Sequence, residues 1–402
     1  SRCTLGAMRE FFVNANFDLS LRPNRRAETV DGRGQQASEM PYHLLLLGTG
    51  GDSVLVDAVP GEAFLAYLER AGLPRPATNV LPGQAPDAQF VPFGWNDEAA
   101  EINSSYTPPA SSPPLDVVRR VNGRRFAAKL ERELFECGEI LGVFDAPEEI
   151  DACIASRPPE EEWLLKSEHG NAGLGNRRLR SPSLSQSDRE VIRRLLSEDV
   201  CVLIEKWRNR VLDIATVFDL DRDGTVKDLS AYEVVNTADG AFIGSIFDRT
   251  SEIVDPWLPP VTDVALKVAH ALFQEGYFGP VCLDHFVWLD GNNRQLRPLS
   301  DLNARLQVSA PILRLWRSWG ADRVVYWRLF ATRKLRLPSD YLELETALGG
   351  DVFNATNRRG ILVTSPFEVA GRRLRRVGVL LAGESRAEVE AMDRNLRERF
   401  EK

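Results

Sequence analysis

The stretch "CLDHFVWLDGNNRQLRPLSDLNAR", residues 282–305, reads as two apolar strands joined by a tight turn. The Asp-Gly pair at residues 290–291 is the usual signal of a β-hairpin. Because alternate residues of a strand share one face, the second strand should present three polar side chains together: Asp301, Asn303 and Arg305. The first strand of the pair can bring Asp284 beside them.

These four polar side chains point to a particular chemistry. Two carboxylates and an amide oxygen are the hard oxygen ligands that Mg²⁺ takes when it also holds phosphate oxygens. We therefore predict a magnesium site formed by Asp284, Asp301 and Asn303. Arg305, on the same face, could stabilise charge that develops in a reaction. Such a set is unsuited to a core and unneeded on a surface, so the pattern favours a functional site over a structural hairpin.

A second stretch, "LLKSEHGNAGLGN" (residues 164–176), ends an apolar strand on Lys166 and follows it with three glycines. Glycine-rich segments are costly to order and are kept where backbone approaches a ligand. Lys166 suggests that the ligand approached by Gly170, Gly173 and Gly175 is negatively charged. The alternative is an ordinary surface loop. In both cases Lys166 would be a surface residue whose loss changes stability by no more than about 1 kcal/mol.

A third stretch, "VCVLIEKWRNRVLDIATVF" (residues 200–218), is an apolar strand that stops abruptly on Glu205, Lys206 and Trp207. Backbone N–H and C=O groups left unpaired at such a hinge could read the edge of a planar heterocycle. Asp213 could accept hydrogen bonds from hydroxyl groups. The alternative is a plain hairpin with a charged tip.

The remaining patterns indicate a chain of several α/β parts. Residues 1–115 alternate strand-like and helix-like segments, which predicts a small parallel sheet that includes "HLLLLG" (residues 43–48) as a strand. "QSDREVIRRLLSE" predicts a helix with a capping signal at Ser187. The Pro- and Ser-rich run at residues 104–116 reads as a linker. Our division of the chain follows these patterns: residues 1–115, 116–200, 201–335 and 336–402.

Taken together, these stretches resemble the ATP-grasp superfamily. "VLIEKW" followed by an acidic residue is similar to the adenine-binding hinge of D-alanine–D-alanine ligases, and "DLNAR" is similar to the Glu-x-Asn-x-Arg signature of the biotin carboxylase branch. The resemblance covers about residues 117–310. It implies a Rossmann-like pre-ATP-grasp domain, a central two-part ATP-grasp fold and a small C-terminal α/β piece.

The resemblance also implies roles for individual residues. Lys166 would contact the α- and β-phosphates, and Glu205 the adenine amino group. Gly170, Gly173 and Gly175 would form a lid over the triphosphate, with residues 168–176 mobile when no nucleotide is bound. Lys206 and Trp207 would form the hinge backbone, and Asp213 would hold the ribose. The remaining assignments are magnesium for Asp284, Asp301 and Asn303, and the acyl phosphate for Arg305.

Two positions depart from the family pattern. Asp301 stands where the metal signature has Glu, so bidentate bridging of two ions is less certain. Arg124 stands where an earlier ATP-binding lysine is expected, and Lys129 is a possible substitute. Arginine can hold phosphate in a bidentate manner, so neither change removes the chemistry.

Three motifs imitate other functions. Residues 219–230 resemble a calcium loop, but Ser230 stands where the bidentate Glu is required, so we expect a hairpin turn. Residues 48–53 lack the third glycine of a dinucleotide loop and should form a turn. Residues 313–336 mix basic and aromatic side chains, and their spacing predicts a packed helix with a basic outer face rather than a nucleic-acid or membrane surface.

Composition narrows the class of protein. The 402 residues, 43% hydrophobic and 27% charged, suit a globular protein of two or three domains. A net charge of −8 disfavours binding to nucleic acid, and no apolar run is long enough for a membrane span. Five cysteines without a Cys-x-x-Cys pair, and no recognisable signal peptide, indicate a reducing, cytoplasmic location.

The reaction implied by the resemblance is an ADP-forming carboxylate–amine ligation with ATP and Mg²⁺ as cofactors. The partners would be a small-molecule carboxylate and an amine, with amino-acid or peptide-like character, and the chain could form a homodimer. The alternatives are a non-catalytic nucleotide-binding module and a small-metabolite kinase. Residues 93–106 and 236–252 are candidates to line the substrate cleft, with Arg249 as a carboxylate partner.

Overall fold

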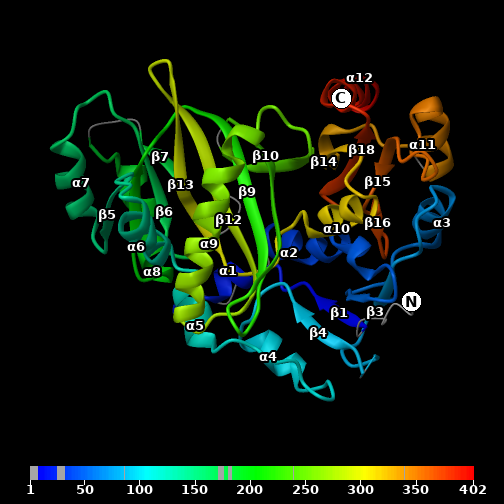
Figure 1. Cartoon of the computed structure of the whole chain (residues 1–402), viewed down its shortest axis with the longest axis horizontal. Coiled ribbons are helices and arrows are strands. Elements are labelled where there is room, and N and C mark those ends of the chain that lie inside the picture. The colour runs from blue at the N-terminus through cyan, green and yellow to red at the C-terminus, as the bar shows by residue number, and fades with distance from the viewer. Residues whose placement is uncertain are drawn as a thin grey trace.

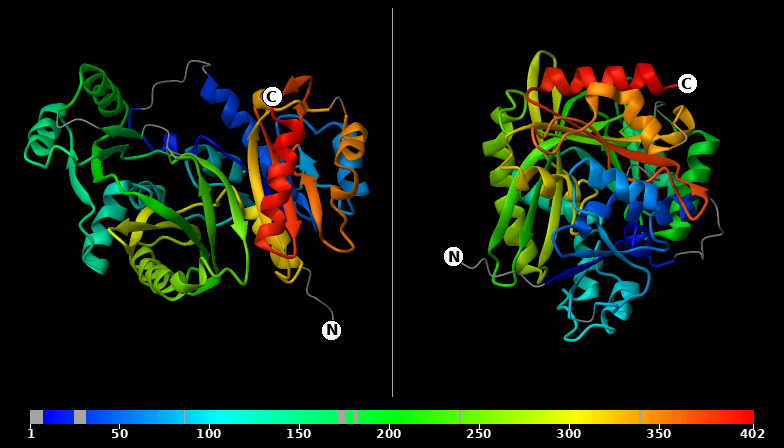
Figure 2. Two further views of the ribbon diagram at one scale, coloured as in Figure 1. Left: turned by 90° about the horizontal axis from the view of Figure 1, so that it is seen from above. Right: turned by 90° about the vertical axis from the view of Figure 1, so that its right-hand side faces the viewer.

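Figure 1 shows the computed structural model of the chain, which describes residues 8–24, 32–85, 87–170, 176–179, 183–238, 240–338 and 340–402, with the backbone alone for residues 32–37. A small parallel sheet near the N-terminus lies below a long antiparallel sheet, and a second small antiparallel sheet lies at the opposite end of the molecule (Figures 1 and 2). None of the helices in the described part combines the length and apolar character that a membrane span requires.

The N-terminal sheet is parallel, as predicted, with strand order β3-β2-β1-β4. Its strands are β1 (Arg9–Phe12), β2 (Ser53–Leu55), β3 (Ala77–Asn79) and β4 (Gln89–Pro92). Its helices are α1 (Phe17–Ser20), α2 (Gly32–His43), α3 (Glu62–Arg70) and α4 (Asp97–Asn103).

The predicted strand at residues 43–48 is wrong, because this segment forms the 3-10 helix η1 (Leu45–Gly48). All four residues of η1 are buried, so the run has no alternation of apolar and polar positions. A short, wholly apolar run fits a buried strand and a buried helix equally well, and its period cannot decide between them.

The second sheet is antiparallel and has strand order β5-β8-β6-β7. Its strands are β5 (Ile140–Phe144), β6 (Trp163–Ser167), β7 (Arg177–Leu179) and β8 (Val202–Lys206). Helices α7 (Pro147–Ala155) and α8 (Gln186–Glu198) contribute to its core. The capping residue of α8 is Ser185, not the predicted Ser187, because the Ser185 hydroxyl accepts from the Asp188 N–H and Asp188 bonds back to Ser185.

The long sheet has eight strands in the order β13-β12-β9-β10-β11-β14-β18-β15. Six of them are β9 (Arg210–Leu220), β10 (Val226–Asn236), β11 (Phe242–Phe247), β12 (Gly279–Asp290), β13 (Asn293–Asn303) and β14 (Val324–Ala331). The other two, β15 (Gly360–Val363) and β18 (Arg376–Gly383), come from residues 336–402 and extend the same sheet (Figure 1).

Helices and short elements lie over this sheet or along its edges. The helices are α5 (Leu115–Val121), α6 (Arg124–Phe135), α9 (Leu258–Gln274), α10 (Ala310–Ser318), α11 (Tyr341–Leu348) and α12 (Arg386–Phe400). The short elements are η2 (Asp255–Trp257), η3 (Thr332–Lys334), η4 (Gly349–Asp351), β16 (Glu368–Val369) and β17 (Arg372–Arg373).

Two predictions for this region have different outcomes. The calcium-like residues 219–230 do form a turn between β9 and β10. The single helix predicted over residues 313–336 is wrong. α10 ends at Ser318, Gly320 has φ +78°, and the β-branched and aromatic residues that follow form the buried strand β14. A glycine with positive φ ends the helix, and the apolar spacing on either side of it belongs to two different elements.

Candidate functional site

A cavity of about 1500 Å³ is lined by the N-terminal part of the chain, the second sheet and the long sheet, and the polar hairpin residues line it too. Its wall includes residues of the N-terminal part, of β6, of β9, β12 and β13, and of the segments around η3 and the start of β18. Of the predicted site residues, eight described side chains line it, together with Gly170: Arg124, Lys166, Trp207, Asp213, Asp284, Asp301, Asn303 and Arg305.

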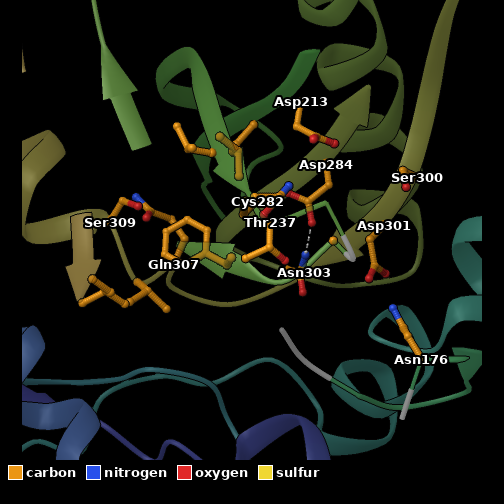
Figure 3. Close-up of a pocket in the computed structure, with 18 of the residues that line it drawn as sticks. Asn176, Asp213, Thr237, Cys282, Asp284, Ser300, Asp301, Asn303, Gln307 and Ser309 are labelled. Atoms are coloured by element: carbon orange, nitrogen blue, oxygen red, sulfur yellow. Dashed lines mark hydrogen bonds between the residues drawn. The ribbon is translucent and has the colours of Figure 1, made fainter. Parts of the chain in front are cut away.

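The hairpin β12–β13 brings the predicted metal ligands together. Asp284 is the direct cross-strand partner of Asp301, and Cys282 is the partner of Asn303. The Asn303 amide donates to an Asp284 oxygen at 3.2 Å, and Figure 3 shows the three polar side chains around one side of the cavity. The alternation in the sequence therefore produces the shared face that we predicted.

Arg305 follows the end of β13 and closes this group of side chains. Its guanidinium donates to the Asn303 side-chain oxygen at 3.0 Å and to Asp18 of α1 at 2.9 Å. The guanidinium also lies 4.9 Å above the Phe93 ring. Arg305 thus joins the hairpin to the N-terminal part of the chain and presents a fixed positive charge to the cavity.

The electrostatics of the carboxylates suit a divalent cation. Burial and the neighbouring Asp301 carboxylate together raise the pKa of Asp284 to about 7. Two facing carboxylates that disfavour each other's charge form a site where a cation would be stabilising. Within the described ranges no three His, Cys, Asp or Glu side chains gather as a metal site. A cation here would therefore also need the Asn303 oxygen, and these oxygen donors fit Mg²⁺.

Lys166 is the first member of a chain of buried ion pairs that continues through Glu205 to Arg297. Its burial contradicts the prediction that it is a surface residue. Its side chain is 6% exposed, and its Nζ lies 2.9 Å from Glu205 Oε1. The other Glu205 oxygen lies 2.9 Å from the Arg297 guanidinium, which also pairs with Glu131 at 2.9 Å. Both Glu205 oxygens are thus held in ion pairs. The side chain predicted to meet adenine does not line the cavity.

Arg297 supports the site from the interior of the fold, and sequence reasoning missed it. It is fully buried and holds Glu205, which in turn holds Lys166. A signal was present, because counting back in twos from Arg305 through Asn303 and Asp301 reaches Arg297 on the same strand.

Arg124, rather than the alternative Lys129, reaches the cavity. Its guanidinium donates to Asp301 at 3.1 Å and to the backbone oxygens of Ser167 at 2.7 Å and Gly170 at 3.1 Å. Lys129 is exposed on the outer side of α6. Arg124 therefore connects the start of the glycine-rich segment with the predicted metal ligands.

The glycine-rich segment is described only at its two ends, so Gly173 and Gly175 lie outside the described residues. At its first end Glu168 and His169 are buried. The His169 N–H donates to Asp199 at 2.6 Å, and Arg22 donates to the His169 backbone oxygen at 2.8 Å. This part of the predicted mobile lid is instead tied to α8 and to the N-terminal part.

The predicted hinge differs from expectation in its hydrogen bonds. The N–H groups of Lys206 and Trp207 donate to backbone oxygens of Glu139 and Glu162, so these two groups are already paired. The Lys206 side chain pairs with Glu161 and does not line the cavity.

Two other residues beyond the end of β8 do reach the cavity. The Trp207 ring lies under the Arg178 guanidinium at 4.3 Å. Asp213, on β9, lies 3.2 Å from Arg210. An aromatic face and a carboxylate in the wall of the cavity are suited to stacking a base and accepting hydroxyl hydrogen bonds.

The candidate substrate segments are partly correct. Phe93 and residues 236–238 line the cavity, whereas Arg249 is exposed elsewhere and does not. Sequence reasoning also missed a second group of lining residues from α2, η3 and the β17–β18 turn: Glu39, His43, Arg333, Arg375 and Arg376. They are far apart in the sequence and belong to no recognisable motif.

No family model matches this sequence, and none of the curated proteins matches it. Solved structures do resemble it along nearly the whole chain. Phosphoribosylamine–glycine ligase from Thermotoga maritima is 15% identical, with 98% of this chain and 97% of that chain covered and a TM-score of 0.58. Carboxyaminoimidazole ribonucleotide synthase from Aspergillus clavatus, complexed with ATP, is 13% identical, with 98% of both chains covered and a TM-score of 0.55.

A third similar structure is the biotin carboxylase domain of the Hydrogenobacter thermophilus 2-oxoglutarate carboxylase, in complex with MgADP and bicarbonate. It is 12% identical, with 98% of this chain and 90% of that chain covered and a TM-score of 0.57. At these identities the likeness concerns the fold. The chain has the ATP-grasp fold of such ligases, as the sequence predicted.

Proposed function

We propose that this chain is an ATP-dependent ligase that converts a carboxylate to an acyl phosphate and joins it to an amine, releasing ADP and phosphate. The main support is the facing pair Asp284 and Asp301, with Arg305 beside it, in the cavity of an ATP-grasp fold. A protein that only bound adenine would have no need for this group. The similar structures with bound ATP and MgADP add support at the level of the fold.

The phosphates of ATP would lie between two buried cations. Arg124 and Lys166 both line the cavity close to the carboxylate pair, since Arg124 contacts Asp301 and Lys166 donates to the backbone oxygen of Ser300. Buried cations whose positions are fixed by neighbours neutralise phosphate charge without reorganisation. Trp207 and Asp213, which line the same cavity, would hold the base and ribose.

Asp284, Asp301 and Asn303 would hold Mg²⁺. When bound, the ion would neutralise phosphate oxygens and orient the terminal phosphoryl group. Arg305, fixed by Asp18, would hold the substrate carboxylate in line with that group and stabilise the charge of the acyl phosphate. The protein performs no covalent chemistry in this proposal, and the reaction depends on positioning and charge.

The deciding experiment incubates the protein with ATP, Mg²⁺ and a panel of amino acids and small carboxylic acids, and measures both nucleotides and products. We expect ADP and an amide whose formation requires an acid and an amine together. AMP as the nucleotide product would contradict the acyl-phosphate mechanism. A phosphorylated small molecule without an amide would identify a kinase, and tight ATP binding without turnover would identify a nucleotide-binding module.

A further inference from the structure

The cavity extends beyond the predicted metal ligands to a second group of charged residues. Glu39 and His43 lie one turn apart on α2, and Arg333 and Arg376 lie on η3 and at the start of β18. Glu39 connects α2 with the segment that precedes β18, because its Oε2 accepts the Arg375 N–H at 2.9 Å. The cavity therefore has acidic and basic side chains close together at this end.

Two polar atoms at this end are buried and have no partner among the described residues. They are Glu39 Oε1 and His43 Nδ1, and their residues are 2% and 6% exposed. A buried polar atom without a hydrogen bond is costly, and such atoms concentrate where a ligand supplies the missing partner. Burial and the nearby Arg376 lower the pKa of His43 to about 4, so its imidazole is neutral at neutral pH.

The two arginines also lack ion-pair partners in the part of the chain that the structure describes. Across the described ranges, no carboxylate lies within ion-pair distance of the Arg333 or Arg376 guanidinium. Arg376 is half-buried, and burial lowers its pKa while Glu39 opposes that change. Unpaired guanidinium groups in a cavity are suited to a carboxylate or a phosphate.

We infer that this end of the cavity binds a zwitterion, a primary amine that carries a carboxylate or a phosphate, and that this molecule is the amine substrate. Arg333 and Arg376 would hold its anionic group. Glu39 and His43 would accept hydrogen bonds from its amine. An anion without an amine would leave the buried Glu39 oxygen unpaired, and an amine without an anion would leave the arginines unpaired.

The identity of the ligand as the amine substrate rests on the proposed ligase function, whereas its binding does not. Direct binding is therefore measured by calorimetry on the full chain without ATP. The probes are β-alanine and O-phosphoethanolamine, which distinguish a carboxylate from a phosphate. Ethanolamine carries the amine alone, and propionate and inorganic phosphate carry the anionic group alone; these three are the separate halves. We expect one zwitterion to bind at least about tenfold more tightly than either of its halves.

Variants then locate the binding. Arg333→Met changes an exposed, unpaired side chain and should not affect folding, and it should weaken zwitterion binding at least about tenfold. Glu39→Gln should weaken it similarly. Arg373→Met, an exposed arginine outside the cavity, is the matched control and should bind as the parent does. Lys166→Ala should keep zwitterion binding while losing ATP affinity.

Three outcomes would overturn the inference: no zwitterion binds at millimolar concentration, a separate half binds as tightly as the zwitterion, or Arg333→Met and Glu39→Gln both bind like the parent. Failure of the proposed function gives a different result, because ADP release would then be absent even when the zwitterion binds and the variants weaken it.

Discussion

Asp284 faces Asp301 directly across the β12–β13 ladder, and both carboxylates line the cavity that Lys166 and Arg124 also reach. Like charges opposite each other destabilise a sheet unless something compensates for them. Arg124 pairs with Asp301, whereas no cationic side chain pairs with Asp284 among the described residues, although Asn303 donates to it. A bound cation would therefore reduce the repulsion between the two carboxylates and stabilise the pair.

Replacing Asp301 by Asn should remove the gain in nucleotide affinity that Mg²⁺ provides. The amide keeps the size of the side chain but loses the charge that a hard cation requires. We expect ATP affinity without Mg²⁺ to stay within about twofold of the parent, and turnover with Mg²⁺ to fall at least about 100-fold. Calorimetry with and without Mg²⁺ measures the first effect. Asp290→Asn, in the exposed hairpin turn, is the control. An unchanged magnesium dependence would exclude Asp301 as a ligand.

Replacing Lys166 by Ala should affect both binding and stability. ATP affinity should fall and turnover should nearly vanish, because a fixed cation beside the phosphates is lost. Glu205 would keep only Arg297 as a partner while staying buried, so we expect unfolding in urea to show a loss of about 2 to 4 kcal/mol. The exposed Lys129→Ala should show neither change. A stable Lys166→Ala protein that turns over ATP normally would contradict the placement of this residue at the site.

The hairpin that carries the predicted magnesium ligands could be predicted from sequence because its main signals are local. The Asp-Gly turn predicts the hairpin, and the alternation indicates which side chains share a face. The pairing of Asp284 with Asp301 also depends on a register shift between Asp284 and Phe286, which the sequence does not indicate. Arg297 lies on the same strand but was missed. Its partners Glu131 and Glu205 are 166 and 92 residues away, on α6 and β8. The alternation along β13 could have drawn attention to Arg297, but no local pattern reports the contacts with Glu131 and Glu205, which only the tertiary fold makes.

The remaining errors have a related cause. Residues 45–48 and the segment through Gly320 consist of buried or mixed apolar runs, which fit helix and strand equally well. Glu39 and Arg376 come together because α2 packs against β18, elements more than 330 residues apart. Charged residues in such positions look like ordinary surface residues in the sequence.

Arg305 should contribute mainly to the chemical step. Arg305→Lys keeps a positive charge but cannot hold Asn303 and Asp18 at once in the geometry of the planar guanidinium. We expect kcat to fall about 100-fold or more while ATP affinity changes little, because the lost interaction acts on the acyl phosphate. Arg294→Lys, exposed near the hairpin turn, is the control for steady-state kinetics and ATP binding. An equal loss of ATP affinity would assign Arg305 to nucleotide binding instead.

Glu205 should make stability depend on acidity in a specific direction. Burial alone would raise its pKa, but the Arg297 and Lys166 charges outweigh burial and lower the pKa from 4.5 to about 2. A carboxyl whose pKa is depressed by folding stabilises the folded state above the unfolded pKa, and this contribution disappears as the pH falls through the folded pKa. The ionised carboxylate should thus contribute about 3 kcal/mol at neutral pH, and this should be lost progressively between pH 4.5 and about 2.

Glu205→Gln tests this dependence, because it removes the titrating group and keeps the shape of the side chain. The variant should be less stable than the parent at neutral pH, and its unfolding free energy in urea should approach that of the parent as the pH falls below 4.5. Other carboxyls titrate in both proteins, so the difference between the two curves is the quantity to measure. Exposed Glu160→Gln should follow the parent throughout. Parallel curves for the parent and Glu205→Gln would mean that the ion pairs with Lys166 and Arg297 do not hold Glu205 ionised.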